Sequence, residues 1–352
     1  MTVSTAVDLD PAAAAGKLAD QPSSRSTFLS YLARKVLAAV VSFFITLVIG
    51  FVLFSLMPSD PVGTLTRGRP VSAAQIATLR RQLGVDEPVW HRFLTFVGHV
   101  FTGQLGYSYQ YQQSVASLIG SRIGPTLLLT GTATVISVVL GLWLGIRSGW
   151  RHGSLLDRVA SGTSLTLWSV PTFWLGLILL VLFSVGFGPI PALFPAAGMT
   201  TPGFTGGTFA QILDVAHHLV LPALTLVLVV FAQYVTIMRS SIIDELGSPY
   251  LLTARAKGLR DDDVRRKHAV PNALLPSVTV IFLQIGGLIG GAIAVETVYS
   301  WPGLGYLTFN ALKIPDLQLL EGTFIIFSAS VIVMNLLADL LYRYLDPRVR
   351  AQ

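Results

Sequence analysis

The sequence predicts an all-α integral membrane protein with six transmembrane helices. Of its 352 residues, 52% are hydrophobic and only 12% are charged, against about 25% charged in an average soluble domain. The apolar residues gather in six runs, each close to the roughly 20 residues that a helix needs to cross a bilayer. Residues 239–276 interrupt these runs with a polar, charge-dense stretch that contains its own helix start and stop signals.

The N-terminal part predicts a tail followed by a first transmembrane helix. Residues 1–30 are small and polar, which is typical of a disordered segment. The run Val36–Met57 contains no charged residue and directly follows Arg34 and Lys35. It is too long for the core of a signal peptide. We therefore expect a transmembrane helix over residues 31–57.

Residues 58–125 are predicted to form a helical segment outside the membrane. Ser72 and Gln75 have the spacing of a capping box, and Gly84 would end the helix that they open. Pro88 opens a second helix, in which five apolar residues share one face: Trp90, Phe93, Leu94, Val97 and Phe101. Such a face suits a helix along the membrane surface or under a partner. Packing against the transmembrane bundle explains it as well, and we favour that interpretation.

Residues 126–352 are predicted to form a core domain of five transmembrane helices. The runs are Thr126–Ile146, Val159–Val185, Leu219–Met238, Pro276–Val298 and Thr323–Tyr342, and Pro171 breaks the second of them. Lys and Arg gather in the N-terminal tail, in residues 147–158, in the polar loop 239–275 and at the C-terminus, which together hold 17 of the 24. By the positive-inside rule, these segments and both termini are expected to be cytoplasmic.

The polar loop predicts a first short helix with a defined start and stop. Ser248 suits an N-cap, and Pro249 suits a first helical position, where its missing N–H is not needed. The helix would run to about Lys257, and Gly258 suits the left-handed residue that ends a helix. A flexible connection would need neither signal, so this segment is expected to present a surface.

A second short helix is predicted to begin at Asp261. Asp262 and Asp263 would lie in its first turn, where negative charge is favourable. Pro271 is expected to interrupt or bend this helix, and Pro276 to lead into the next apolar run.

The loop resembles the coupling loop of ABC importer permeases. The resemblance rests on TARAKGL, which ends at Leu259, and on HAVPNALLP, whose Pro271 lies thirteen residues after Gly258. It is most similar to the permeases of dipeptide and oligopeptide importers, a group that also includes nickel carriers. Leu252, Thr253 and Ala254 stand at the family's EAA positions, so its acidic residue is absent here, and His268 replaces an apolar residue. With SVPTFWLGL, GGAIAVETVYSWPGLG and LLYRYLDPRVR, the resemblance covers about residues 30–350.

The resemblance implies the type I ABC importer permease fold with a cytosolic coupling helix pair. It also implies a subunit of a bacterial inner-membrane importer of di- or oligopeptides. The chain would form half of a pore beside a second homologous permease subunit, receive its cargo from an extracytoplasmic solute-binding protein, and be driven by two cytosolic ATP-binding subunits that hold ATP and Mg²⁺. The residues implied to couple to these ATPases are Tyr250, Thr253, Ala254, Arg255, Ala256, Lys257, Gly258, Leu259, His268, Pro271 and Asn272.

Polar residues within the spans are candidates for a solute path. Glu296 near the outer end of the fifth span could line the path or bind a peptide amino group, and it could equally cap a neighbouring loop. Gln233 and Gln284 are weaker candidates, because hydrogen bonds between helices explain them as well. Asp339 is expected to form a structural pair with Arg343, four residues on.

The sequence shows no motif of a catalytic, nucleotide-binding or metal-binding site. Its Gly16-Lys17 pair lacks the flanking residues of a phosphate-binding loop. The chain has no cysteine, and the adjacent His217 and His218 would point to different faces of a helix, which suits a metal poorly. We therefore expect no enzyme, no cofactor or metal in this chain and no nucleic-acid partner. An importer of nickel or another small solute stays open. An ion-coupled secondary transporter is the alternative class, although it would usually show repeated halves and buried acids.

Overall fold

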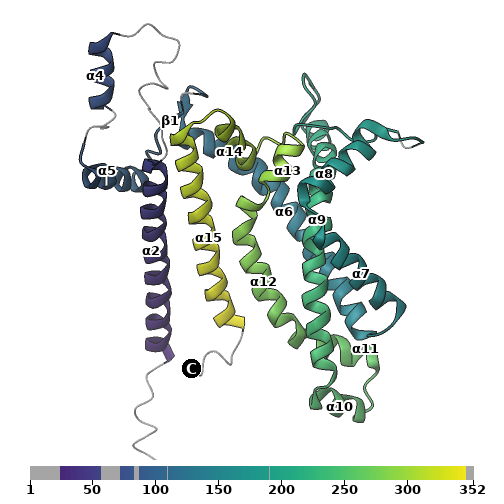
Figure 1. The fold of residues 1–352 in the computed structure, drawn as a ribbon. Helices are drawn as coiled ribbons and strands as arrows, with labels where there is room; N and C mark the ends of the chain where they lie inside the picture. Colours follow the sequence, from purple (N-terminus) through teal and green to yellow (C-terminus); the bar gives the residue numbers. More distant parts are fainter. Residues whose placement is uncertain (1–23, 57–71, 83–86, 109, 190, 346–352) are drawn as a thin grey trace, which may run out of the picture.

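The computed structural model describes residues 24–56, 72–82, 87–108, 110–189 and 191–345, and most of these are helical (Figure 1). The five longest helices are α2 (Ser24–Leu56), α6 (Val115–Trp150), α9 (Thr208–Leu246), α12 (Val270–Gly291) and α15 (Leu317–Leu345). The shorter ones are α4 (Ala73–Gln82), α5 (Val89–Phe101), α7 (Leu155–Ser169), α8 (Thr172–Leu180), α10 (Pro249–Ala256), α11 (Asp261–Val264), α13 (Ile293–Val298) and α14 (Leu304–Lys313). Strands β1 (Tyr107–Ser108) and β2 (Gln113–Ser114) pair antiparallel.

Within the described residues, four helices are long and apolar enough to cross a membrane: α2 from Ser30, α6, α9 and α15 to Leu340. A fifth candidate is α7 together with residues 172–186, and these two parts are bent by 99° at a break next to Pro171. The predicted span 276–298 is divided near its end, between α12 and α13. The protein is a multi-pass membrane protein, but the predicted count of six spans is not confirmed.

The first residues of α2 and α6 differ from the predicted helix boundaries. Helix α2 begins at Ser24, inside the predicted tail, whose first 23 residues lie outside the described part of the chain. Helix α6 begins at Val115 and continues through Pro125, so the predicted boundary between an outer segment and a span falls inside one helix. The capping box forms as predicted. The Ser72 N–H donates to Gln75 Oε1 (2.8 Å), and the Gln75 N–H donates to Ser72 Oγ (3.3 Å).

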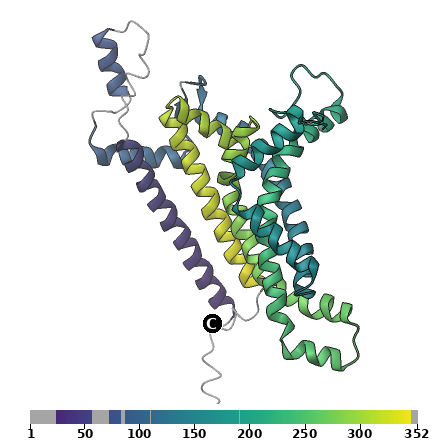
Figure 2. The same cartoon turned by 45° about the vertical axis from the view of Figure 1, so that its right-hand side comes forward.

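The molecule has two distinct ends. Helices α10 and α11 lie together at one end, and β1, α13 and α14 lie at the other (Figures 1 and 2). We call these the helix-pair end and the α14 end. Helix α2 stands at the edge of the bundle beside α15, and α5 lies across α2 near the α14 end. The first turns of α2 and the last turns of α15 are both at the helix-pair end.

Helices α6 and α9 pack in close backbone contact. Gly141, Gly145 and Gly149 recur every four residues, so they share one face of α6. A Cβ atom on Gly145 would lie 2.7 Å from Met238 Cβ and 2.9 Å from the Val235 carbonyl oxygen. On Gly149 it would lie 2.8 Å from the carbonyl oxygen of Arg239. Only glycine fits at these positions, and the two helices therefore run side by side as one unit.

Buried apolar residues form three cores. One lies between α6, α9 and α13 and includes Leu129, Leu221, Val295, Tyr299 and Trp301. A second lies under α14 and includes Val115, Leu118, Leu304, Leu307 and Leu319. The third lies at the helix-pair end and includes Met238, Ile242, Leu251, Ala254, Val264, Ala269 and Ala273. This third core fixes α10 and α11 to the helices behind them.

Candidate functional site

Helix α10 begins where the sequence predicts. Ser248 has extended backbone angles at the N-cap position, and Pro249 is the first helical residue. The Ser248 hydroxyl does not accept a hydrogen bond from α10. It donates instead to Glu245 Oε2 at 3.2 Å, in the last turn of α9. The serine therefore joins α9 to the start of α10.

The stop after α10 also follows the prediction. Gly258 has a φ of 78°, in the left-handed region that favours glycine. Its N–H donates to the Arg255 carbonyl oxygen (2.9 Å), and the Leu259 N–H donates to that of Ala254 (3.4 Å). These bonds satisfy carbonyl groups that the end of a helix leaves open. The chain then turns sharply toward Asp261.

The predicted interruption at Pro271 is wrong. Helix α11, the π-helical turn η2 (Arg265–Ala269) and α12 follow one another without a break. In η2 the Val270 N–H donates to the Arg265 carbonyl oxygen, five residues back. An α-helix would press the ring of Pro271 against the carbonyl of Lys267, and the wider π turn relieves this clash just before the proline. The predicted second short helix is thus the first part of one longer helix, which continues through η2 into α12.

The inner side of the helix pair is fully packed. Leu251 and Val264 have no exposed surface, and Ala254 is 5% exposed. They pack on Met238 and Ile242 of α9, which are also fully buried. Ala254, implied to meet a partner, is therefore a packing residue of this core.

The outer side of the helix pair leaves a continuous surface open. Of the other implied coupling residues, His268 is half-buried, and the following are exposed: Tyr250, Thr253, Arg255, Ala256, Lys257, Gly258, Leu259, Pro271 and Asn272. Leu252, beside them on α10, is 60% exposed. Apolar and basic side chains are thus presented together on a rigid support.

One polar link joins the helix pair to α6. Trp150, the last residue of α6, donates its indole N–H to Asp261 Oδ2 at 2.7 Å. The Arg255 guanidinium lies 5.6 Å from the centroid of the Trp150 ring and 3.5 Å from Asp261 Oδ1. One tryptophan therefore contacts both halves of the pair.

A second polar link joins α9, α10 and α12. The Tyr250 hydroxyl donates to Glu245 of α9, and Asn272 Nδ2 donates to the Tyr250 oxygen at 3.1 Å. Partial burial, followed by the bond to Glu245, raises the pKa of Tyr250. The tyrosine stays protonated, so it keeps donating this hydrogen bond.

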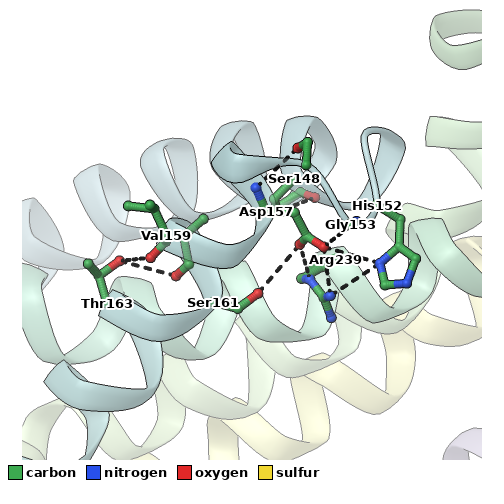
Figure 3. A network of polar contacts seen from close by, with 11 residues as sticks. Ser148, His152, Gly153, Asp157, Val159, Ser161, Thr163 and Arg239 are labelled. Atoms are coloured by element: carbon green, nitrogen blue, oxygen red, sulfur yellow. Dashed lines mark hydrogen bonds and ion pairs between the residues drawn. The ribbon is translucent and has the colours of Figure 1, made fainter.

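A third polar link lies beside the pair and joins α7, α9 and the turn between α6 and α7 (Figure 3). Arg239 of α9 donates to Asp157 of α7 twice, from Nε to Oδ1 (2.5 Å) and from a terminal nitrogen to Oδ2 (3.0 Å). Asp157 Oδ2 also accepts from the Gly153 N–H (2.9 Å) and lies 3.1 Å from His152 Nδ1. The Asp157 side chain is only 3% exposed. A buried carboxylate with a two-point arginine partner fixes α7 to α9 at this level.

Most of the chain matches known permeases. Residues 137–351 match the family described as the binding-protein-dependent transport system inner membrane component, and residues 28–130 match the corresponding N-terminal family. The chain belongs to this family. It therefore has the type I ABC importer permease fold and is the membrane component of such a transport system.

Named relatives align with this permease from end to end. It is 38% identical over 324 residues to a peptide permease protein of Brucella suis, 34% identical over 335 residues to the dipeptide transport system permease protein of Escherichia coli, and 36% identical over 323 residues to the glutathione transport system permease protein of Pectobacterium atrosepticum. Each alignment covers 92% of the permease and 99% of the relative.

The structure brings two of the predicted path residues of the permease together. Gln284 Nε2 of α12 donates to Gln233 Oε1 of α9 at 2.5 Å, and both side chains are partly exposed. They form a polar bridge between two long apolar helices. The alternative of a hydrogen bond between helices is therefore realised at this pair.

Glu296 holds the α14 end of the permease together. Its side chain is fully buried. It accepts from Thr126 Oγ1 of α6 (2.8 Å) and from the Tyr306 N–H in the first turn of α14 (3.0 Å). The Thr126 oxygen in turn accepts from the Leu304 N–H at 2.8 Å. Of the two interpretations left open, capping of a neighbouring segment describes the observed contacts.

Other polar residues of the permease also have structural partners. Asp339 pairs with Lys35 of α2 at 2.7 Å, and the expected partner Arg343 has its side chain outside the described part of the chain. His218 approaches the Asp214 carbonyl oxygen (2.8 Å), and His217 approaches that of Leu193 (3.0 Å). Among the described residues, no group of three or more His, Asp or Glu could hold a metal ion.

Sequence reasoning missed two members of this site. Neither Trp150 nor Asp157 was predicted to have a role, and only the Lys and Arg residues of the loop 147–158 entered the prediction. A signal was available for Asp157, since an acid in the first turn of a helix, preceded by Ser154, favours a helix start. Nothing in the sequence connects either residue with the helix pair more than 80 positions away.

Proposed function

We propose that this permease is half of the pore of an ATP-driven importer of di- or oligopeptides. The relatives named for peptides, dipeptides and glutathione support the class of cargo. A second homologous permease subunit would complete the pore, and an extracytoplasmic solute-binding protein would deliver the cargo. Two cytosolic ATP-binding subunits would bind ATP and Mg²⁺, and this chain would carry out no catalysis.

The helix-pair end is proposed to face the cytosol, in a bacterial inner membrane. The basic residues of the loops support this orientation. The first turns of α2 and the last turns of α15 lie at the same end, so both chain termini would be cytoplasmic. The α14 end, with α5 and the strands, would then face the solute-binding protein.

One observation carries the proposed coupling role. The helix pair is buried on its inner side by Leu251, Val264 and their neighbours, while Tyr250, Leu252 and Lys257 remain exposed on its outer side. A surface that is apolar and basic at once, on a rigid support, suits a protein partner. A push on this surface would pass through two polar links and one core into α6, α9 and α12. The Asp157–Arg239 pair would pass it from α9 to α7.

The test is a charge reversal on this surface. Lys257→Glu is expected to lower peptide uptake per ATP hydrolysed in vesicles that contain the complete importer. Lys313→Glu is the matched control, because Lys313 is an equally exposed lysine at the α14 end. Normal coupling in Lys257→Glu, together with normal binding of the ATP-binding subunits, would contradict the proposed role. Full transport by this chain alone would favour a secondary transporter instead.

A further inference from the structure

Helix α5 carries three kinds of side chain on three faces. Phe93 and Phe96 are half-buried and turn toward α2. Trp90, Leu94 and Phe101 are large, apolar and 65%, 59% and 72% exposed. A third, polar stripe is exposed and is spaced four residues apart: His91, Thr95 and His99. An apolar face beside a polar face is typical of a helix at a membrane interface.

The rings of α5 reach deep along α2. The Phe93 centroid lies 5.2 Å from that of Phe51 and 6.1 Å from that of Phe44, and Phe101 lies 6.3 Å from Phe43. Phe44 is twelve residues before the end of α2 at Leu56, which is about 18 Å along the helix axis. The side chains of α5 thus meet α2 within its apolar span, between Phe43 and Phe51.

The outer surface of α2 at this depth is the kind that faces lipid. Val40, Ile45 and Leu53 are 59%, 51% and 53% exposed. Leu94 and Phe101 of α5 are also exposed, and α5 lies across α2 (Figures 1 and 2). An aqueous setting for such a patch would be unfavourable by about 25 cal/mol for each Å² exposed.

We propose that α5 is an interfacial helix whose Trp90–Leu94–Phe101 face is covered by acyl chains of one lipid leaflet. Its polar stripe would lie among headgroups and water. Trp90 suits that boundary, since tryptophan is enriched at membrane–water interfaces. Helix α5 would then fix the height of α2 in the bilayer from the α14 end. This leaflet would be the outer one if the α14 end faces away from the cytosol, and only that assignment rests on the proposed function.

The chain has no cysteine, so single labels report one position each. We would introduce Leu94→Cys and, as a matched control on the next residue, Thr95→Cys. The complete importer carrying a nitroxide at one position would be placed in vesicles of phosphatidylethanolamine and phosphatidylglycerol. The label at 94 is expected to collide more with oxygen, which dissolves in lipid, than with a water-soluble nickel chelate. The label at 95 is expected to show the opposite preference.

Two results would overturn this inference. Stronger collision with the nickel chelate at 94 would place that face in water. An immobile label at 94, shielded from both reagents, would show that a partner protein covers it. Trp90→Cys, on an exposed apolar residue of the same face, gives the same comparison if Leu94→Cys does not fold. Uptake measured in the same vesicles separates this inference from the proposed function, because either can fail alone.

Discussion

Helix α9 is held by α6 through backbone contacts, whereas α2 is held by α15 through side chains. Three glycines let α6 approach α9, and Asp157 and Arg239 join α7 to the same body. The contacts of α2 with α15 include Phe54 against Phe324 (6.0 Å between centroids) and the Lys35–Asp339 pair.

This difference separates a rigid body from a peripheral helix. The helix pair continues directly from α9 and into α12, so its movement is expected to carry α6, α7 and α9 with it. Many of the apolar side chains of α2 are exposed. Among the described residues, the core that holds α10 and α11 contains none from α2. Changes in the α6–α9 body should therefore matter more than equivalent changes at α2.

The largest effect is expected at the glycine face. Gly145→Leu places a side chain where even a Cβ atom lies 2.9 Å from the Val235 carbonyl oxygen. Overpacking typically costs 1–3 kcal/mol, and backbone on both sides leaves less room to adapt, so about 3 kcal/mol or more is expected. The thermal midpoint of the protein in detergent would measure it. Gly131→Leu, on the same helix with nothing within 4 Å of its added Cβ, should leave the midpoint nearly unchanged. Equal losses in the two variants would contradict the close contact.

The next effect is expected at the Asp157–Arg239 pair. Asp157→Ala leaves the partly buried Arg239 without its partner, and such a loss costs about 3–5 kcal/mol in a buried site. Arg239→Met and the double variant complete a cycle, and we expect the double variant to be more stable than the sum of the single losses predicts. Chemical or thermal unfolding of the solubilised permease provides the measurement. Additive losses would show that the two residues act independently.

A change at Trp150 is expected to lower stability less, but to weaken the coupling of ATP hydrolysis to peptide uptake. Trp150→Phe keeps the ring under Arg255 and removes the N–H that binds Asp261, a loss of about 1 kcal/mol. Peptide uptake per ATP hydrolysed should fall, while the amount of assembled importer should hold. Trp143→Phe, an exposed tryptophan of the same helix, serves as the control. A fall in both variants would point to a general effect on α6.

The smallest effect is expected at the peripheral pair. Lys35→Met breaks a contact to Asp339 whose side chains are 31% and 44% exposed, and exposed pairs contribute about 0–1 kcal/mol. The thermal midpoint should move little, and coupling should not change. A loss as large as that of Asp157→Ala would remove the distinction between the two regions.

The local signals in the sequence were sufficient for the start and stop of α10. Pro249 and Gly258 act through their own backbone restrictions, so no partner is needed to interpret them. The outcome at Pro271 could not be predicted in this way, because the π turn that accommodates it depends on packing of Ala269 and Ala273 against α9. The burial of Ala254 likewise could not be predicted from its neighbours in the sequence, because it depends on packing against α9.

Partners distant in sequence account for the remaining differences. Asp339 pairs with Lys35, which lies more than 300 positions away in the sequence. Glu296 has no neighbour in the sequence that indicates Thr126 or the start of α14. Asp339 was expected to be structural and Glu296 was left open between two roles, and in both cases the observed partner is set by tertiary packing.

Site-specific photo-crosslinking tests the central claim most directly. A photoreactive residue would replace Leu252 on the helix pair or, as control, Leu312 at the α14 end, two exposed leucines at 60% and 58%. The position at 252 is expected to join this chain to an ATP-binding subunit, and the position at 312 is not. A crosslink to that subunit from 312, or its absence from 252 in an active importer, would contradict the account.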